Sequence, residues 1–261
     1  MQTLLFDSAL LPHGWAEHVA VRIDAAGTLA AVTPGAEEGE RVAGCVLPGV
    51  PNLHSHAHQR AMAGLAEHSG GSADSFWTWR AAMYHFVARI QPHHLQAIAA
   101  QLYVEMLKAG YTSVAEFQYL HHDPDGRPYD AVAEMSLRVL AAAREVGIGL
   151  TNLPVLYRYG GFGEQKPTAG QRRFLNDADR FLVLVDTLLK ESRDDPNVAT
   201  GIAPHSLRAV SEGLLRAVLE AWSRRDNGPI HLHIAEQIKE VEDCLAWCGR
   251  CLLYTSDAAD E

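Results

Sequence analysis

The chain has 261 residues, 48% of them hydrophobic, and a formal net charge of -10. This length can bury a sizeable core in one large or two small domains. The negative charge argues against nucleic acid or an anionic membrane as a partner. No apolar run reaches the roughly 18 residues of a transmembrane helix, and the first residues lack the basic segment of a secretory signal. Four cysteines in a chain of this size do not suggest a disulfide scaffold, so a reducing, cytoplasmic setting is expected.

Short strands and turns are predicted for residues 1–47, with strands at 18–23 and 29–32 around a turn. A strand–helix rhythm follows. In chain order its predicted elements are strand 46–54, helices 75–90 and 92–109, strand 111–117, helix 130–146, strand 148–156, helix 170–192, strand 198–203, helix 211–225, strand 229–234 and helix 235–248. Strands that alternate with helices of this length indicate parallel βαβ units, and therefore the α/β class.

Alternate histidines end the first strand of this rhythm, where residues 47–56 read LPGVPNLHSH. Side chains two apart on a strand point the same way, with Cα atoms roughly 6–7 Å apart. His54 and His56 can therefore bind one metal ion. A strand that ends by presenting two ligands suits a catalytic metal, which keeps an open position for water. The other interpretation, two unrelated polar residues in a turn, is less favoured because the pattern recurs.

The second instance lies in residues 228–236, which read GPIHLHIAE. His231 and His233 share a face of this apolar strand, and Glu236 follows His233 by three residues. A carboxylate beside a hydrolytic metal site is the group needed for proton transfer. Two such strands, the later one with a trailing Glu, predict a metal-dependent hydrolase.

Other histidines have plainer interpretations. His58 lies past the end of the first strand and is expected to support the ligands rather than to be one. His231 is expected to be a hydrogen-bonded core residue. His93–His94 and His121–His122 are expected on the surface.

Three cysteines, Cys244, Cys248 and Cys251, have the spacing of a radical iron–sulfur motif. We favour inert cysteines on a helix face. Residues 251–261 resemble translated sequencing-adapter read-through, so a non-native tail is expected there.

Functional residues at successive strand ends indicate a (β/α)8 barrel, whose sites lie at that face. The sequence offers about five of the eight strand–helix units. We therefore predict an N-terminal β region at 1–47, a truncated metal-dependent hydrolase barrel at 48–250 and a non-native tail at 251–261. The fragment by itself is expected to be inactive and poorly folded, because the open edge of the last strand is unpaired.

Several motifs resemble the amidohydrolase superfamily, and within it the deiminases that hydrolyse N-formimino-L-glutamate. The resemblance covers about residues 1–250. Its motifs are NLHSHAHQR at 52–60, FWTWR at 76–80, EFQY at 116–119, APHSLR at 203–208 and HLHIAEQ at 231–237.

The resemblance implies roles for nine residues. The implied zinc ligands are His54, His56 and His233. Glu236 is implied to move a proton to the substrate nitrogen. The residues implied to bind the glutamate portion are Gln59, Arg80, Tyr119, His205 and Arg208. The family also uses a His after strand six and an Asp after strand eight, which have no counterpart here.

The resemblance further implies one zinc per chain, because residues 198–203 lack the Lys with which two-metal relatives bridge their ions. His ligands suit Zn²⁺. The implied substrate is a small dicarboxylate that an acidic protein repels overall, so recognition must use local cations. Arg80 and Arg208 are the candidates, because a guanidinium pairs bidentately with carboxylate. A homodimer is expected for the full-length protein.

Two other functions remain open. One is a mononuclear deaminase acting on a purine or pyrimidine base, which would favour aromatic stacking and amide contacts over two arginines. The other is a non-catalytic fragment that binds zinc. Sequence beyond residue 249 would discriminate between them.

Overall fold

The structure is a computed structural model that describes residues 1–65, 76–225 and 228–250, in two compact units that divide after Val50. This division falls slightly later than the boundary expected at residue 47. The suspected tail at 251–261, with Cys251, lies outside the described residues. No helix in the described ranges has the length and apolar character needed to cross a membrane.

The first unit is a four-stranded sheet of order β3-β2-β1-β4. Its strands are β1 (Gln2–Leu11), β2 (Gly14–Ile23), β3 (Leu29–Thr33) and β4 (Glu40–Val46). The β1–β2 and β2–β3 pairs are antiparallel, and β4 pairs with β1 in parallel. The strands predicted at 18–23 and 29–32 are the second half of β2 and most of β3.

The second unit alternates strands with helices, as predicted. Its strands are β5 (Val50–Ser55), which begins at the division, β6 (Tyr111–Gln118), β7 (Gly149–Leu156), β8 (Val198–Thr200) and β9 (Ala203–Pro204). Its α-helices are α1 (Phe76–Val87), α2 (Pro92–Lys108), α3 (Glu134–Val146), α4 (Ala178–Ser192), α5 (Glu212–Ser223) and α6 (Ile238–Cys248). Two short 3-10 helices are η1 (Ala57–Met62) and η2 (Ala169–Gln171).

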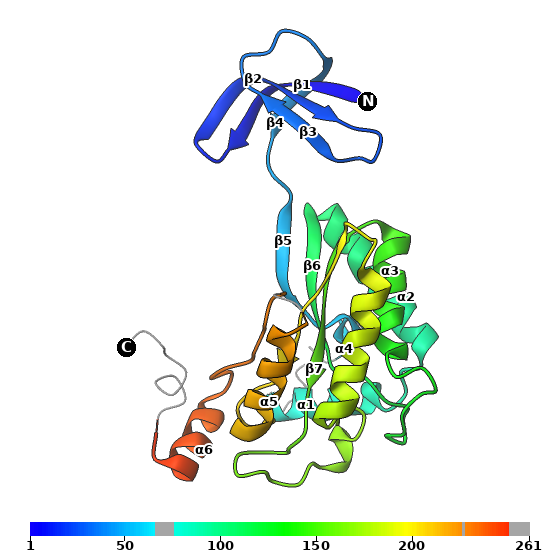
Figure 1. Cartoon of the computed structure of the whole chain (residues 1–261), viewed down its shortest axis with the longest axis vertical. Helices are drawn as coiled ribbons and strands as arrows, with labels where there is room; N and C mark the ends of the chain where they lie inside the picture. The colour runs from blue at the N-terminus through cyan, green and yellow to red at the C-terminus, as the bar shows by residue number, and fades with distance from the viewer. Residues whose placement is uncertain (66–75, 226–227, 251–261) are drawn as a thin grey trace. The chain divides into compact units, whose positions relative to one another are not determined.

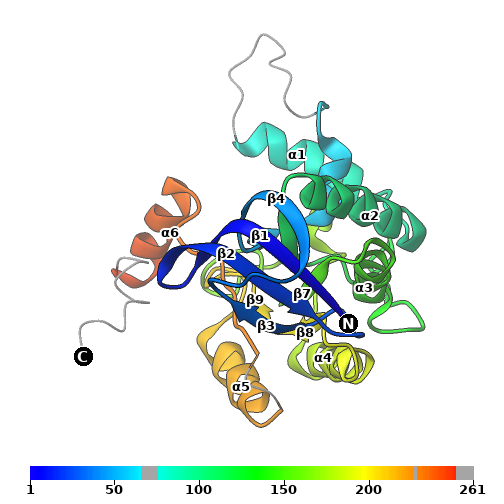
Figure 2. The same cartoon turned by 90° about the horizontal axis from the view of Figure 1, so that it is seen from above.

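The sheet of this unit has the order β5-β6-β7-β8, with β9 paired to β7 (Figure 1). The β6–β7, β7–β8 and β7–β9 pairs are parallel. Seen from above, α2, α3, α4 and α5 follow one another around the outside of the strands (Figure 2). A parallel sheet wrapped by the helices that connect its strands is part of an α/β barrel.

The core of the unit explains why the central strands are apolar on both faces. Phe117 on β6 and Leu153 on β7 are fully buried. Helix α3 adds Val139 and Ala143, which are four residues apart and so lie on one face of the helix. Strands covered by helices on one side and by barrel residues on the other bury both faces.

Two strand predictions were wrong at their ends. The strand predicted at 46–54 is divided, because Val46 ends β4 and β5 begins at Val50. The strand predicted at 198–203 breaks at residues 201–202 into β8 and β9, which both pair with β7.

The helix predicted at 170–192 begins only at Ala178, because Asp177 caps it by accepting the Arg180 backbone N–H at 2.9 Å.

The strand predicted at 229–234 is an extended segment with a single bridge, between Ile202 and Ile230. The His231 N–H donates to the Ile202 carbonyl at 3.0 Å and the His233 N–H to the His205 carbonyl at 2.9 Å. The donors are two residues apart but the acceptors are three apart. This shift in register prevents a regular ladder.

Two glycines allow this segment to approach the sheet. A Cβ added at Gly201 would collide with the Pro229 carbonyl oxygen, and one added at Gly228 would collide with the Thr200 carbonyl oxygen. Each glycine therefore permits a backbone-to-backbone contact that any side chain would block.

We predict that Gly201→Ala destabilises the fold by about 1–3 kcal/mol, because the new methyl group overpacks a close contact. Gly213→Ala is the matched control, since a Cβ at this position in α5 meets nothing within 4 Å. The control should be neutral or stabilising by up to about 1 kcal/mol. Urea unfolding of the two variants checks this, and equal midpoints would contradict the close-contact argument.

Candidate functional site

Three histidines converge at the end of the sheet. The Nε2 atom of His54 lies 3.1 Å from Nε2 of His56 and 3.2 Å from Nε2 of His233. One ligand atom from each of the three lies within 4.8 Å of the others. His54 is on β5, His56 follows its last residue, and His233 belongs to the extended segment. This spacing makes the three histidines a candidate site for one metal ion.

The surroundings of His56 fix which nitrogen faces the centre. Its Nδ1 lies 3.0 Å from the Phe117 carbonyl oxygen. A carbonyl oxygen only accepts, so Nδ1 of His56 carries the proton. Nε2 therefore directs its lone pair towards the other two histidines. Burial lowers the pKa of His56 to about 4 and that of His233 to about 3. Both imidazoles are therefore neutral at physiological pH, as a metal requires, and this donor set fits a metal such as zinc.

Phe117 also contacts His233, the third histidine of the cluster. Its ring stacks on the imidazole of His233, with centroids 4.2 Å apart. Phe117 is fully buried on β6. One core residue thus positions two candidate ligands that are far apart in the sequence.

Glu116 holds the turn that carries His56. Its Oε1 accepts the Ala57 backbone N–H at 2.5 Å, and its Oε2 accepts the Tyr103 hydroxyl at 3.2 Å. It is also hydrogen-bonded to the Ser55 side chain. Because Ser55 and Ala57 flank His56, this buried carboxyl group fixes the backbone on both sides of the ligand.

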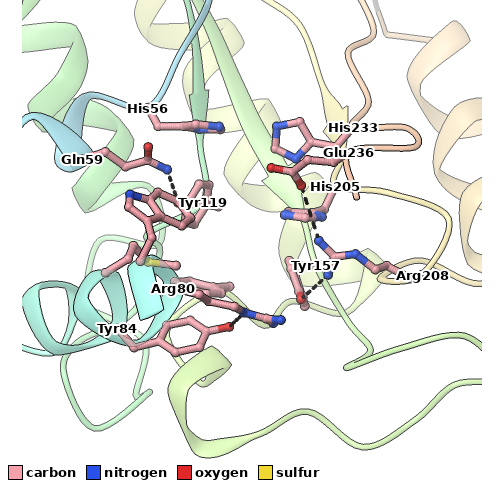
Figure 3. Close-up of a pocket in the computed structure, with 13 residues that line it drawn as sticks. His56, Gln59, Arg80, Tyr84, Tyr119, Tyr157, His205, Arg208, His233 and Glu236 are labelled. Carbon is pink, nitrogen blue, oxygen red and sulfur yellow. Dashed lines mark hydrogen bonds and ion pairs between the residues drawn. The ribbon is translucent and has the colours of Figure 1, made fainter. Parts of the chain in front are cut away.

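The histidines open onto a pocket, shown in Figure 3. His56 and His233 lie at one end, and the guanidinium groups of Arg80 and Arg208 lie at the other. The pocket is lined by His56, Gln59, Trp79, Arg80, Met83, Tyr84, Tyr119, Tyr157, Phe174, His205, Arg208, His233 and Glu236. All five residues expected to bind the glutamate portion line it, together with Glu236. His54 borders a neighbouring opening with His56 and His233.

Tyr119 organises one wall of the pocket. Gln59, from η1, donates its Nε2–H to the Tyr119 oxygen at 3.0 Å. The Nε2 of His58 lies 2.9 Å from the same oxygen. His58 is fully buried and lies outside the set of three converging histidines.

Arg208 lies on the opposite wall between carboxylates. Its Nε is 3.3 Å from Glu240 and one terminal nitrogen is 3.9 Å from Glu236. Ala235 has a φ of 52°, and the chain bends at this residue, between His233 and Glu236. This bend directs Glu236 towards the pocket that also contains the His205 ring, whose centroid is 4.9 Å from that of His233.

Sequence reasoning missed several residues of the site. Tyr84 accepts the Arg80 Nε–H at 2.9 Å, Tyr157 contacts Arg208, and Glu240 pairs with Arg208. Glu116 was quoted only as part of a motif. Tyr84 lies four residues after Arg80, so helical spacing could have found that contact. The others depend on contacts between distant segments.

The expectation that His121 and His122 are surface groups was wrong. Both are buried. Their Nε2 atoms are satisfied by hydrogen bonds with carbonyl oxygens, of Val155 at 2.8 Å for His121 and of Leu175 at 2.6 Å for His122. Among the cysteines, Cys244 is buried, Cys248 is exposed, and their sulfur atoms are 3.9 Å apart.

Residues 45–261 match the family model described as "Amidohydrolase family". The chain therefore belongs to the amidohydrolase family. It is 52% identical to a formimidoylglutamate deiminase of Pseudomonas aeruginosa over all of this chain and 58% of that protein. It is 26% identical to an 8-oxoguanine deaminase of the same species, over 82% of this chain and 45% of that one. The solved structure of an amidohydrolase from Brucella melitensis superposes with a TM-score of 0.92 at 46% identity, over 98% of this chain and 56% of that one. The chain thus spans about half the length of these relatives.

We predict that Glu116 makes stability depend on pH. Burial raises its pKa from 4.5 to about 7, so the folded state holds this proton more tightly than the unfolded chain does. Its contribution is fully present below about pH 4.5 and is lost as pH rises through about 7, a change on the order of 3 kcal/mol.

Urea unfolding at pH 5 and pH 8 checks this. The difference in unfolding free energy between the two pH values should shrink in Glu116→Gln. It should persist in Glu145→Gln, which removes an exposed carboxyl from α3. An unchanged pH difference in Glu116→Gln would show that another group is responsible.

Proposed function

We propose that this chain carries the metal-binding and substrate-binding part of a zinc-dependent enzyme that hydrolyses N-formimino-L-glutamate to N-formyl-L-glutamate and ammonia. One observation carries the proposal: a single pocket joins His56 and His233, two of the three convergent imidazoles, at one end to two guanidinium groups at the other. The 52% identity to a formimidoylglutamate deiminase supports the same reaction.

His54, His56 and His233 would hold one zinc ion per chain. Three neutral imidazoles suit Zn²⁺, which also accepts a fourth ligand. A zinc ion in such a site lowers the pKa of a coordinated water towards about 7, which provides a nucleophile at neutral pH.

Glu236 is the proposed proton carrier. It follows His233 after a bend at Ala235, and its carboxylate lies at the pocket, 3.9 Å from Arg208. Addition of water to the C=N carbon leaves a tetrahedral carbon, and ammonia departs only after its nitrogen is protonated. A carboxylate within reach of both the water and that nitrogen can transfer this proton.

Arg80 and Arg208 are the proposed carboxylate-binding residues. The substrate is a dianion, and the chain has a net charge of -10, so long-range electrostatics oppose binding. The two guanidinium groups at the far end of the pocket would provide local attraction for the carboxylates of the substrate. Gln59, Tyr119 and His205 are proposed to bind the remaining polar atoms of the glutamate portion.

A base deaminase is the second candidate, favoured by the similarity to an 8-oxoguanine deaminase. Aromatic rings line the pocket, as a flat base would require. However, a neutral base carries no carboxylate for the two guanidinium groups to bind. The two guanidinium groups therefore favour a dicarboxylate.

We further propose that the sheet is part of an eight-unit barrel, that the enzyme acts in histidine degradation in the cytoplasm, and that it forms a homodimer without nucleic-acid or membrane partners. The barrel is supported by the parallel strand order and by the superposition with the Brucella amidohydrolase. The proposals on setting and assembly rest on composition and on the resemblance.

We predict that the complete protein contains about one zinc per chain, because one set of three ligands is present in the described residues. Metal analysis of purified protein tests this. His56→Ala and His233→Ala should lose the bound metal, whereas His93→Ala, at an exposed position of α2, should retain it. Full retention in both ligand variants would exclude the assignment.

We predict that Arg80→Met costs about 1.5–3 kcal/mol of transition-state binding, or roughly ten- to hundredfold in kcat/KM for formiminoglutamate. Arg208→Met should cost at least as much, because it also leaves Glu240 without its cation. Arg89→Met, an exposed change on the segment after α1, is the control. Unchanged kinetics in both pocket variants would favour the base deaminase.

A further inference from the structure

The oxygen of Tyr157 faces two hydrogen-bond donors and, among the described residues, no acceptor. We propose that the Tyr157 hydroxyl donates a hydrogen bond to a carboxylate of the bound substrate, as a carboxylate-binding residue next to Arg208. The inference rests on the proposed function, since it assigns a further contact within the same pocket.

Tyr157 is well placed for this contact. It directly follows β7, is only 3% exposed and lines the pocket. Its ring lies edge-on to His205, with centroids 4.5 Å apart, and near Phe174 at 5.8 Å. Because two aromatic rings pack against it, its oxygen has a defined position at the end of the pocket that contains the arginines (Figure 3).

The first partner of this oxygen is Gln171, which is also buried. The Oε1 of Gln171 lies 2.7 Å from the Thr168 backbone nitrogen, which can only donate. This contact assigns the amide orientation, so the nitrogen Nε2 must be the atom that faces Tyr157, at 2.6 Å. An amide nitrogen donates and does not accept. The Tyr157 oxygen therefore accepts this hydrogen bond.

The second partner is Arg208, one of whose terminal nitrogens lies 3.4 Å from the same oxygen. A guanidinium group has only donors. The Tyr157 oxygen accepts again, and both of its lone pairs are then used. Its own proton needs an acceptor, and no residue in the described part of the chain supplies one to it.

The two other tyrosine hydroxyls of the pocket differ in this respect. The Tyr119 oxygen accepts from Gln59 and faces the His58 Nε2, which can take its proton. The Tyr84 oxygen accepts one bond, from Arg80, so its second lone pair leaves the direction of its proton undetermined. Only for Tyr157 do two obligatory donors force the proton towards the pocket. A carboxylate is a strong acceptor for it, and the adjacent Arg208 favours the anion.

The first experiment measures the binding of glutarate, a non-reacting dicarboxylate with the carbon chain of glutamate, to the complete protein. Tyr157→Phe keeps the ring and removes the donor, and it should weaken binding about ten- to hundredfold. Tyr159→Phe is the matched control. It makes the same change two residues later, outside this pocket, and should bind as the wild type does.

A second pair of variants guards against a folding defect. Tyr157→Phe leaves the buried Gln171 amide without an acceptor, so the double variant Tyr157→Phe/Gln171→Met removes both partners. It should melt cooperatively and show the same loss of glutarate affinity. Gln171→Met alone keeps the phenolic proton and should retain most of the affinity.

A third comparison separates a direct contact from an effect through Arg208. In an Arg208→Met background, Tyr157→Phe should weaken glutarate binding again by several fold if the hydroxyl touches the ligand. Kinetics with N-formimino-4-aminobutyrate and N-formimino-2-aminobutyrate, each lacking one carboxylate of the substrate, should show no Tyr157→Phe penalty for one of the two.

The outcomes are distinct. Unchanged glutarate affinity in Tyr157→Phe, no further loss in the Arg208→Met background, or an equal penalty on all three formimino compounds would overturn the inference. A wild-type protein that binds glutarate through Tyr157 but does not hydrolyse formiminoglutamate would overturn the proposed function and support the inference.

Discussion

The candidate metal site depends on one strand, β6, and on two consecutive residues within it. The carbonyl of Phe117 determines that His56 presents the lone pair of Nε2, while the ring of Phe117 stacks on His233. Glu116 holds the backbone on both sides of His56. Ligands that are about 180 residues apart in the sequence meet because each contacts the same buried pair. In parallel sheets these contacts fall at the carboxyl ends of the strands, where barrel enzymes build their sites. The scaffold therefore fixes imidazole orientation before any metal binds, which limits the reorganisation that binding requires.

The charges around the pocket bear on the proposed binding of an anion by an acidic protein. Arg208 is not a free cation, because Glu240 lies 3.3 Å away and Glu236 at 3.9 Å. Its net electrostatic attraction for a carboxylate is correspondingly reduced. In the proposed function, neutral donors such as the phenol hydroxyls and the Gln59 amide would compensate for this, because they can bond an anion without adding charge. The two carboxylates also hold the Arg208 guanidinium in one orientation.

Sequence patterns predicted the alternation of strands and helices and the shared face of His54 and His56, because both follow from short-range periodicity. The choice of His233 as the third histidine came from the family resemblance. His54 and His56 are two apart on one strand, and their shared face is a property of any extended chain. The patterns failed where contacts with distant segments determine strand register or burial. The segment at 229–234 has the composition of a strand, but its register against residues 202–205 slips by one residue. His121 and His122 lie in a loop rich in turn residues, yet both are buried and bond carbonyl groups that are distant in the sequence. The role of Tyr157 depends on Gln171 and Thr168, which no local pattern connects to it.

The irregular segment that carries His233 has a consequence for how the site is stabilised. Its backbone is held to the sheet by few hydrogen bonds, and it approaches closely only because residues 201 and 228 are glycines. Segments held by few bonds open at low free-energy cost. A metal bound by His54, His56 and His233 would join this segment to β5 and to the residue after it. The metal would bind only when this segment lies against the sheet, because only then do the three histidines converge. Metal binding would therefore stabilise the segment by mass action. Metal binding and local folding at residues 228–236 are therefore linked, and protection of the His231 and His233 amides from hydrogen exchange should increase when zinc is added.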